Sequence, residues 1–141
     1  MDIAGFAAVG LYAGLNTLIL LWIALATGRL RQRTGIYIGD GGNMHLVRIL
    51  RGHANALETI PVVLILMLLM AAFAAPAWVI HLFGIALTVG RFFHAMHFIA
   101  ADAPGWQRRI GAGLSLLVAL LAALGVIGHA IWLMAAPTAG G

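Results

Sequence analysis

The fold class is decided by residues 59–90, which read TIPVVLILMLLMAAFAAPAWVIHLFGIALTVG and include no Asp, Glu, Lys or Arg. Residues 3–28 and 110–141 are also free of these four residue types. Of the 141 residues, 63% are hydrophobic and only 9% are charged, whereas an ordinary soluble domain has about 25% charged residues. Because one membrane crossing takes about 20 apolar residues, we predict an all-α membrane protein with three or four spans and no sizeable soluble domain.

Glycine and proline divide the apolar sequence into segments. A glycine-rich stretch at residues 34–43 predicts a loop, and Ala74-Ala75-Pro76-Ala77 predicts a break inside the long apolar run. The 15 residues from Pro61 to Ala75 rise only about 22 Å, less than the roughly 30 Å hydrocarbon core, so the second span must begin near Met44. We therefore expect one integral membrane domain, residues 1–141, with spans at about 3–27, 44–73, 77–99 and 108–134.

Basic residues predict how these spans are oriented. The first and third loops contain the arginines at the span ends, whereas the second loop and both chain ends contain none. By the positive-inside rule, the two basic loops face the cytoplasm and both termini lie outside. The expected architecture is an antiparallel bundle of four transmembrane helices. Although Ala24-Leu25-Ala26 has the form of a signal-peptide cleavage site, Asp2 stands where basic residues are expected, so we expect no cleavage.

Composition excludes several classes of function. The chain has no cysteine, which rules out a disulfide framework, a thiolate nucleophile and a Cys-based zinc site, so a reactive sulfur must come from a ligand. The net charge of +4 comes from eight arginines and four acidic residues. Since the arginines lie in short loops and apolar segments rather than in one basic stripe, we expect no nucleic-acid partner.

The second predicted span carries a polar face. At 100° per residue, its polar side chains fall within an arc of about 80°; they are Arg48, Arg51, Asn55 and Glu58. Arg48 lies near the helix end, where its side chain can reach the headgroups at little cost. Glu58 could be the structural partner of an arginine on another helix. Asn55 and Glu58 lie deeper, however, where polar groups mark functional sites by default. His53 falls on the opposite side of the helix.

The third predicted span carries Arg91, His94 and His97 on one arc near its end. Arg91 is one candidate partner of Glu58. Two histidines at i and i+3 without a cysteine or a nearby carboxylate are a weak metal signal. We therefore expect no metal site.

The run RILRGHANALETIP, residues 48–61, resembles the second-helix signature of the MAPEG family, the membrane-associated proteins in eicosanoid and glutathione metabolism. Three further motifs follow in the family's order and extend the resemblance over most of the chain: Arg29-Leu30-Arg31, Arg91-x-x-His94 and Arg108-Arg109. The GDGG sequence of the first loop is most similar to the bacterial YecN-like branch. The resemblance implies a homotrimer of four-helix protomers in the bacterial inner membrane. In that membrane, the outside location that the positive-inside rule predicts for both termini is the periplasm.

The resemblance also implies a glutathione site between protomers near the cytoplasmic side. Glutathione has two carboxylates, one ammonium group and a thiol. The residues that the resemblance assigns to it are Arg29, Arg51, Asn55, Glu58, Arg91 and His94. Arg29 and Arg51 would hold carboxylates, Asn55 would hydrogen-bond the peptide, and Glu58 would hold the ammonium group.

For catalysis, the resemblance implies an arginine at the start of the fourth span that holds the thiol as a thiolate, here Arg108 or Arg109. A free thiol titrates near about pH 8.5, and an adjacent permanent cation increases the nucleophilic fraction at neutral pH. The thiolate would attack a lipophilic electrophile that arrives from the membrane lipid, or reduce a lipid hydroperoxide. The expected activity is that of a microsomal-type glutathione transferase or peroxidase, with glutathione as co-substrate.

Sequence differences limit what the resemblance implies about substrates. The eicosanoid enzymes carry tyrosines on helices three and four, where this chain has Phe98 and Gly113, and Ala54 replaces an arginine. Eicosanoid specificity is therefore not expected. One alternative function is a non-enzymatic lipid-binding scaffold, which the family also contains. A second is a proton or metal transporter built on His45, His94, His97 and Glu58, against which the lack of internal repeats argues.

Overall fold

The computed structural model of the protein describes residues 3–136. This part of the chain forms helices α1 (Ile3–Thr34), α2 (Met44–Ala72), α3 (Ala77–Ile99) and α4 (Gly105–Ala135). All four are long and apolar enough to cross a membrane, by length and composition. The predicted all-α class with four long apolar helices is therefore confirmed.

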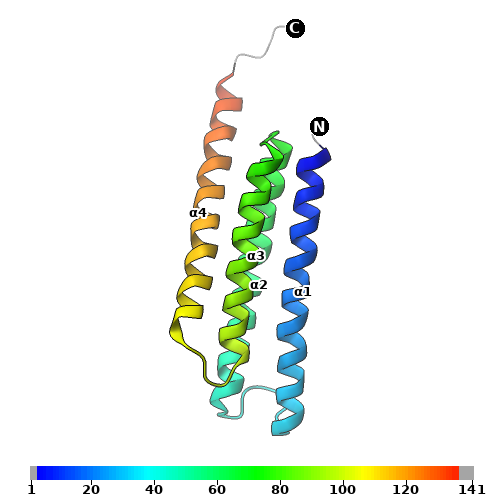
Figure 1. Cartoon of the computed structure of the whole chain (residues 1–141), viewed down its shortest axis with the longest axis vertical. Coiled ribbons are helices and arrows are strands. Elements are labelled where there is room, and N and C mark those ends of the chain that lie inside the picture. Colours follow the sequence, from blue (N-terminus) through cyan, green and yellow to red (C-terminus); the bar gives the residue numbers. More distant parts are fainter. Residues whose placement is uncertain (1–2, 137–141) are drawn as a thin grey trace.

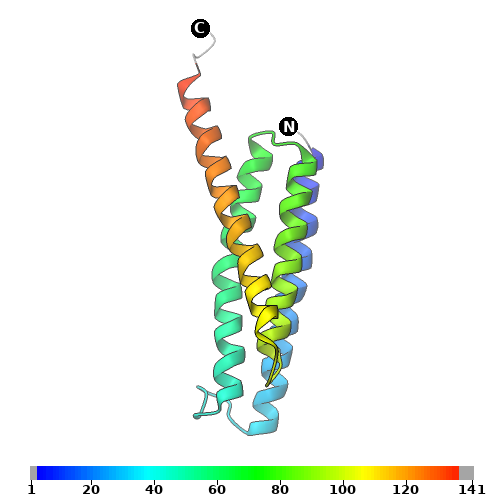
Figure 2. The same cartoon turned by 60° about the vertical axis from the view of Figure 1, so that its left-hand side comes forward.

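Successive helices run antiparallel, so that Ile3 and Ala136 lie at one end of the bundle and the α1–α2 and α3–α4 loops lie at the other (Figure 1). Helices α1, α2 and α3 all contact one another, and α4 packs on α2 and α3. Within residues 3–136, α4 makes no contact with α1. The last turns of α4 extend beyond the other helices (Figure 2). Helix α4 is thus the outer helix of the bundle.

The largest difference from the predicted spans is at the end of α1, which stays helical to Thr34 instead of ending near residue 27. A helix can continue past the hydrocarbon core because arginine side chains are solvated among the headgroups. Beyond α1, the Nη1 atom of Arg31 donates hydrogen bonds of 2.9 Å to the carbonyl oxygens of Ile36 and Gly39. These bonds fix the first half of the glycine-rich loop against α1.

Helix α2 begins at Met44 because the preceding Asn43 caps it. The Asn43 side-chain oxygen accepts hydrogen bonds from the backbone N–H groups of His45 at 3.0 Å and Leu46 at 3.1 Å, which satisfies donors that have no partner inside the helix. With this start, the polar segment 48–58 and the apolar segment after it form one continuous helix.

Two close helix contacts at glycine set the spacing of α2, α3 and α4. A Cβ atom on Gly52 of α2 would lie 2.4 Å from the Cβ of Phe98 on α3. A Cβ atom on Gly111 of α4 would lie 2.7 Å from the carbonyl oxygen of Gly90 on α3. Both distances are too short for nonbonded carbon contacts, so only glycine fits at these two positions. The three helices held in this way surround a large polar cleft.

Candidate functional site

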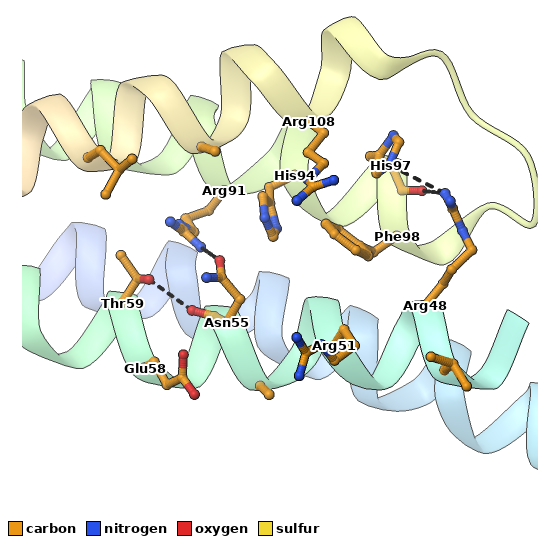
Figure 3. Close-up of a pocket in the computed structure, with 14 residues that line it drawn as sticks. Arg48, Arg51, Asn55, Glu58, Thr59, Arg91, His94, His97, Phe98 and Arg108 are labelled. Carbon is orange, nitrogen blue, oxygen red and sulfur yellow. Dashed lines mark hydrogen bonds between the residues drawn. The ribbon is translucent and has the colours of Figure 1, made fainter. Parts of the chain in front are cut away.

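This cleft has a volume of about 540 Å³ and lies between α2, α3 and α4, towards the α1–α2 and α3–α4 loops (Figure 3). Its charged, histidine and amide lining residues are Arg48, Arg51, Asn55, Glu58, Arg91, His94, His97 and Arg108. Four of these are arginines and one is a carboxylate, so the cleft is strongly positive. Its volume falls within the roughly 300–1,000 Å³ typical of small-ligand sites.

The polar residues of α2 line the cleft together, as their helical spacing predicts. Arg51, Asn55 and Glu58 are exposed in the single chain, and Arg48 is half-buried. The Nη2 atom of Arg48 donates a hydrogen bond of 3.0 Å to the carbonyl oxygen of His97, near the end of α3. Arg48 therefore links α2 to α3.

Arg91, which lines the cleft, joins three helices. Only 3% of the residue is exposed. Its Nε atom donates to the Oγ of Ser115 on α4 at 2.8 Å, and its Nη1 atom donates to the Oδ1 of Asn55 on α2 at 2.9 Å. Ser115 in turn donates to the carbonyl oxygen of Gly111 at 2.8 Å. Figure 3 shows Glu58 on the outer side of α2, pointing away from Arg91. The pairing of Glu58 with Arg91, which the sequence left open, therefore does not form in this chain.

Phe98 forms an aromatic platform at the end of the cleft nearest the loops. The guanidinium carbons of Arg48 and Arg108 each lie 6.0 Å from the centre of its ring. The rings of His94 and His97 lie 4.7 Å and 5.0 Å from it. A ring face attracts cations, so Phe98 helps to keep two guanidinium groups from different helices near each other.

The sequence-predicted site residues do not all meet in one cleft. Arg51, Asn55, Glu58, Arg91 and His94 share the large cleft with Arg108. Arg109 is exposed and is not part of its lining. Arg29 lines a different, smaller cleft between α1, α2 and α3. Within one chain, the structure therefore separates Arg29 and Arg109 from the other predicted residues.

Ser115 is a site residue that the sequence analysis missed. It is fully buried and holds Arg91 in place. The sequence could have indicated its role, since Ser115 is the only hydroxyl-bearing residue in the sequence of α4, Gly105–Ala135. An isolated hydroxyl in an apolar span commonly hydrogen-bonds across helices.

Comparisons with known proteins show the family of the chain. The model of the MAPEG family matches residues 9–128. The chain is 40% identical over 88 residues to "Inner membrane protein YecN" of Escherichia coli strain K12, and the match covers 62% of this chain and 67% of that protein. The protein of the same name from Escherichia coli O6:H1 matches equally well. No solved structure matches the chain.

Proposed function

Because the chain belongs to the MAPEG family, we propose that it is a glutathione-dependent membrane transferase or peroxidase that acts on lipophilic electrophiles. The observation that carries the proposal is the cleft of about 540 Å³, whose lining includes arginines from α2, α3 and α4 and the acidic residue Glu58. The relative is named an inner membrane protein, and we propose the same location here, with both termini periplasmic.

The charges of the cleft complement those of glutathione. Arg51 can hold a carboxylate through paired hydrogen bonds, and Glu58 can hold the ammonium group. The Oδ1 atom of Asn55 already accepts from Arg91, which turns the amide N–H₂ group towards other acceptors, such as a peptide carbonyl of the ligand. His94 lies on the same wall as Arg91 and provides a further polar contact.

We assign the thiolate-stabilising role to Arg108 because it lines the cleft. The guanidinium would favour the thiolate over the thiol by direct charge interaction. In the transferase reaction the sulfur forms a bond to an electrophilic carbon, and the electron pair of the broken bond leaves with the displaced group. In the peroxidase reaction two glutathione molecules supply two electrons, so that the hydroperoxide becomes an alcohol and water while glutathione disulfide forms.

The exposure of charged residues along α2 supports assembly into a homotrimer. Glu58 is the central residue of the helix Met44–Ala72 and is exposed in the single chain. A charged side chain at this depth is costly in lipid, so we propose that a second copy covers this face and completes the glutathione site. Arg29, which lies outside the large cleft of its own chain, could contribute only to the site of a neighbouring copy.

The test is calorimetry of glutathione binding to the purified protein in detergent, with wild type, Arg51→Ala and Glu58→Ala side by side. Saturable binding that both substitutions abolish would support the proposed site. His53→Ala is a matched control, because His53 lies on α2 outside the cleft lining. No binding at millimolar glutathione would refute the proposal and favour the non-enzymatic lipid-binding scaffold.

A further inference from the structure

A second cleft of about 160 Å³ lies between the end of α1, the start of α2 and the end of α3. Its rim carries Arg29 and Arg33, which are one helical turn apart on α1. Its inner wall is apolar and includes Ile49 and Ile99. No carboxylate lines this cleft within the described chain. It therefore combines a cationic rim with an apolar wall.

The two rim arginines are unpaired, unlike the arginine between them. Arg31 donates to the carbonyl oxygens of Ile36 and Gly39. Neither Arg29 nor Arg33 has a hydrogen-bond or ion-pair partner among residues 3–136, and both are exposed. Their donors are thus available to an anion that enters the cleft.

The position along α1 matches the headgroup layer of a bilayer. The apolar part of α1 ends near residue 27, so Arg29 lies about 3 Å and Arg33 about 9 Å further along the helix axis. The headgroup region extends roughly 5–8 Å on each side of the hydrocarbon core. The rim arginines therefore bracket the depth at which lipid phosphates lie.

His45 closes the back of this cleft and keeps its helices together. Its Nε2 atom lies 2.8 Å from the carbonyl oxygen of Ile99. Because a carbonyl can only accept, Nε2 must carry the hydrogen. The bond ties the first turn of α2 to the end of α3, so the cleft has a fixed wall before any ligand arrives.

We infer that this cleft is a binding site for the headgroup of an anionic phospholipid, whose phosphate is held by Arg29 and Arg33 while the start of its acyl chain lies along the partly exposed Leu30 and Ile99. Basic pockets between helices at the cytoplasmic end of a membrane protein suit anionic headgroups. The site is separate from the large cleft of the same chain. Arg33 distinguishes the two proposals, because the glutathione proposal gives it no role.

The experiment is native mass spectrometry of the detergent-purified protein titrated with phosphatidylglycerol or with phosphatidylcholine of the same acyl chains. Phosphatidylglycerol should bind saturably and more tightly than phosphatidylcholine. Arg33→Gln should weaken its binding about fivefold, and the double variant Arg29→Gln with Arg33→Gln about 25-fold, from the usual value of one arginine near an anionic headgroup. Arg33→Lys should retain most of the affinity, because it retains the charge.

The matched control is Arg109→Gln, which removes an exposed arginine at the same end of the bundle but outside this cleft. It should leave phosphatidylglycerol binding unchanged. An equal loss in Arg109→Gln and Arg33→Gln would overturn the site in favour of general surface charge. Displacement of the lipid by millimolar inorganic phosphate would overturn the lipid assignment in favour of a free anion. Glutathione titrated into the wild-type and Arg33→Gln samples reports on the proposed function separately, because that proposal gives Arg33 no role.

Discussion

The Nε atom of Arg91 on α3 donates a hydrogen bond of 2.8 Å to the Oγ of Ser115 on α4, and neither side chain is more than 3% exposed. A neutral hydroxyl thus orients a buried cation. The other end of the same guanidinium reaches Asn55 on α2, so the position of Asn55 in the cleft depends on a residue that does not line it.

Ser115→Ala should lower the free energy of unfolding by about 1–3 kcal/mol, because it leaves a buried charged donor without its acceptor. Thermal unfolding in detergent measures this effect. Thr17→Ala is the matched control, since the Thr17 hydroxyl is exposed and bonds only to the Ala13 carbonyl of its own helix. A Ser115→Ala variant as stable as Thr17→Ala would show that the Arg91 contact contributes little.

Gly111→Ala should destabilise the bundle by more than about 2 kcal/mol, a size typical of overpacked sites, because its Cβ would meet the backbone of α3 at 2.7 Å. Gly113→Ala is a control on the same helix, where a Cβ would meet nothing within 4 Å. That variant should gain up to about 1 kcal/mol from helix propensity. Chemical unfolding of both variants tests the pair, and equal stabilities would contradict the close contact of α3 and α4.

Arg108→Gln should reduce kcat for glutathione conjugation by about 10²–10³-fold, the usual cost of losing one group that stabilises a developing or resident anion. Arg109→Gln should change kcat little, because Arg109 lies outside the cleft lining. A chromogenic aryl halide serves as the electrophile. Equal losses in the two variants, or a larger loss in Arg109→Gln, would contradict the assignment of the thiolate to Arg108.

The same two variants should also differ in how kcat depends on pH. A cation beside the bound thiol lowers its pKa below the ordinary value of about 8.5, so wild-type activity should reach its plateau at a lower pH than the free thiol would allow. In Arg108→Gln the rising limb of kcat should move to higher pH, while in Arg109→Gln it should stay in place. A limb that does not move in Arg108→Gln would mean that another group sets the thiol pKa.

Membrane orientation can be tested with introduced cysteines, because the chain has none of its own. Asp102→Cys lies in the α3–α4 loop and Pro76→Cys precedes α3 at the opposite end of the bundle, both at exposed positions. In intact spheroplasts a membrane-impermeant maleimide should label only the cysteine at position 76, and permeabilisation should add the one at 102. The reverse pattern would place both termini in the cytoplasm.

The sequence predicts relations within one helix better than relations between helices. Arg48 and Glu58 could be placed on one face because the helix period alone fixes their angle. The contact of Arg91 with Ser115 depends on the register of α3 against α4, which the close approach of Gly90 and Gly111 sets. The register of one helix against another cannot be read from the periodicity of a single helix.

Arg29 illustrates the same limit. Its motif assigned it to the glutathione site, but which side of α2 it reaches depends on how α1 packs. In this chain α1 packs on α2 and α3 away from α4, and Arg29 lies at the smaller cleft. A motif match fixes the type of residue at a position, whereas the packing of α1 decides which cleft that residue faces.

Four arginines and one acidic residue line the large cleft, and within residues 3–136 the buried Arg91 has only neutral partners. The like charges of the arginines repel one another with little screening, since they lie in or near a medium of low dielectric constant. An anion that enters acts as the counter-ion of the whole cluster. Binding of the anion therefore also raises the free energy of unfolding. The bound ligand then helps to hold α2, α3 and α4 together.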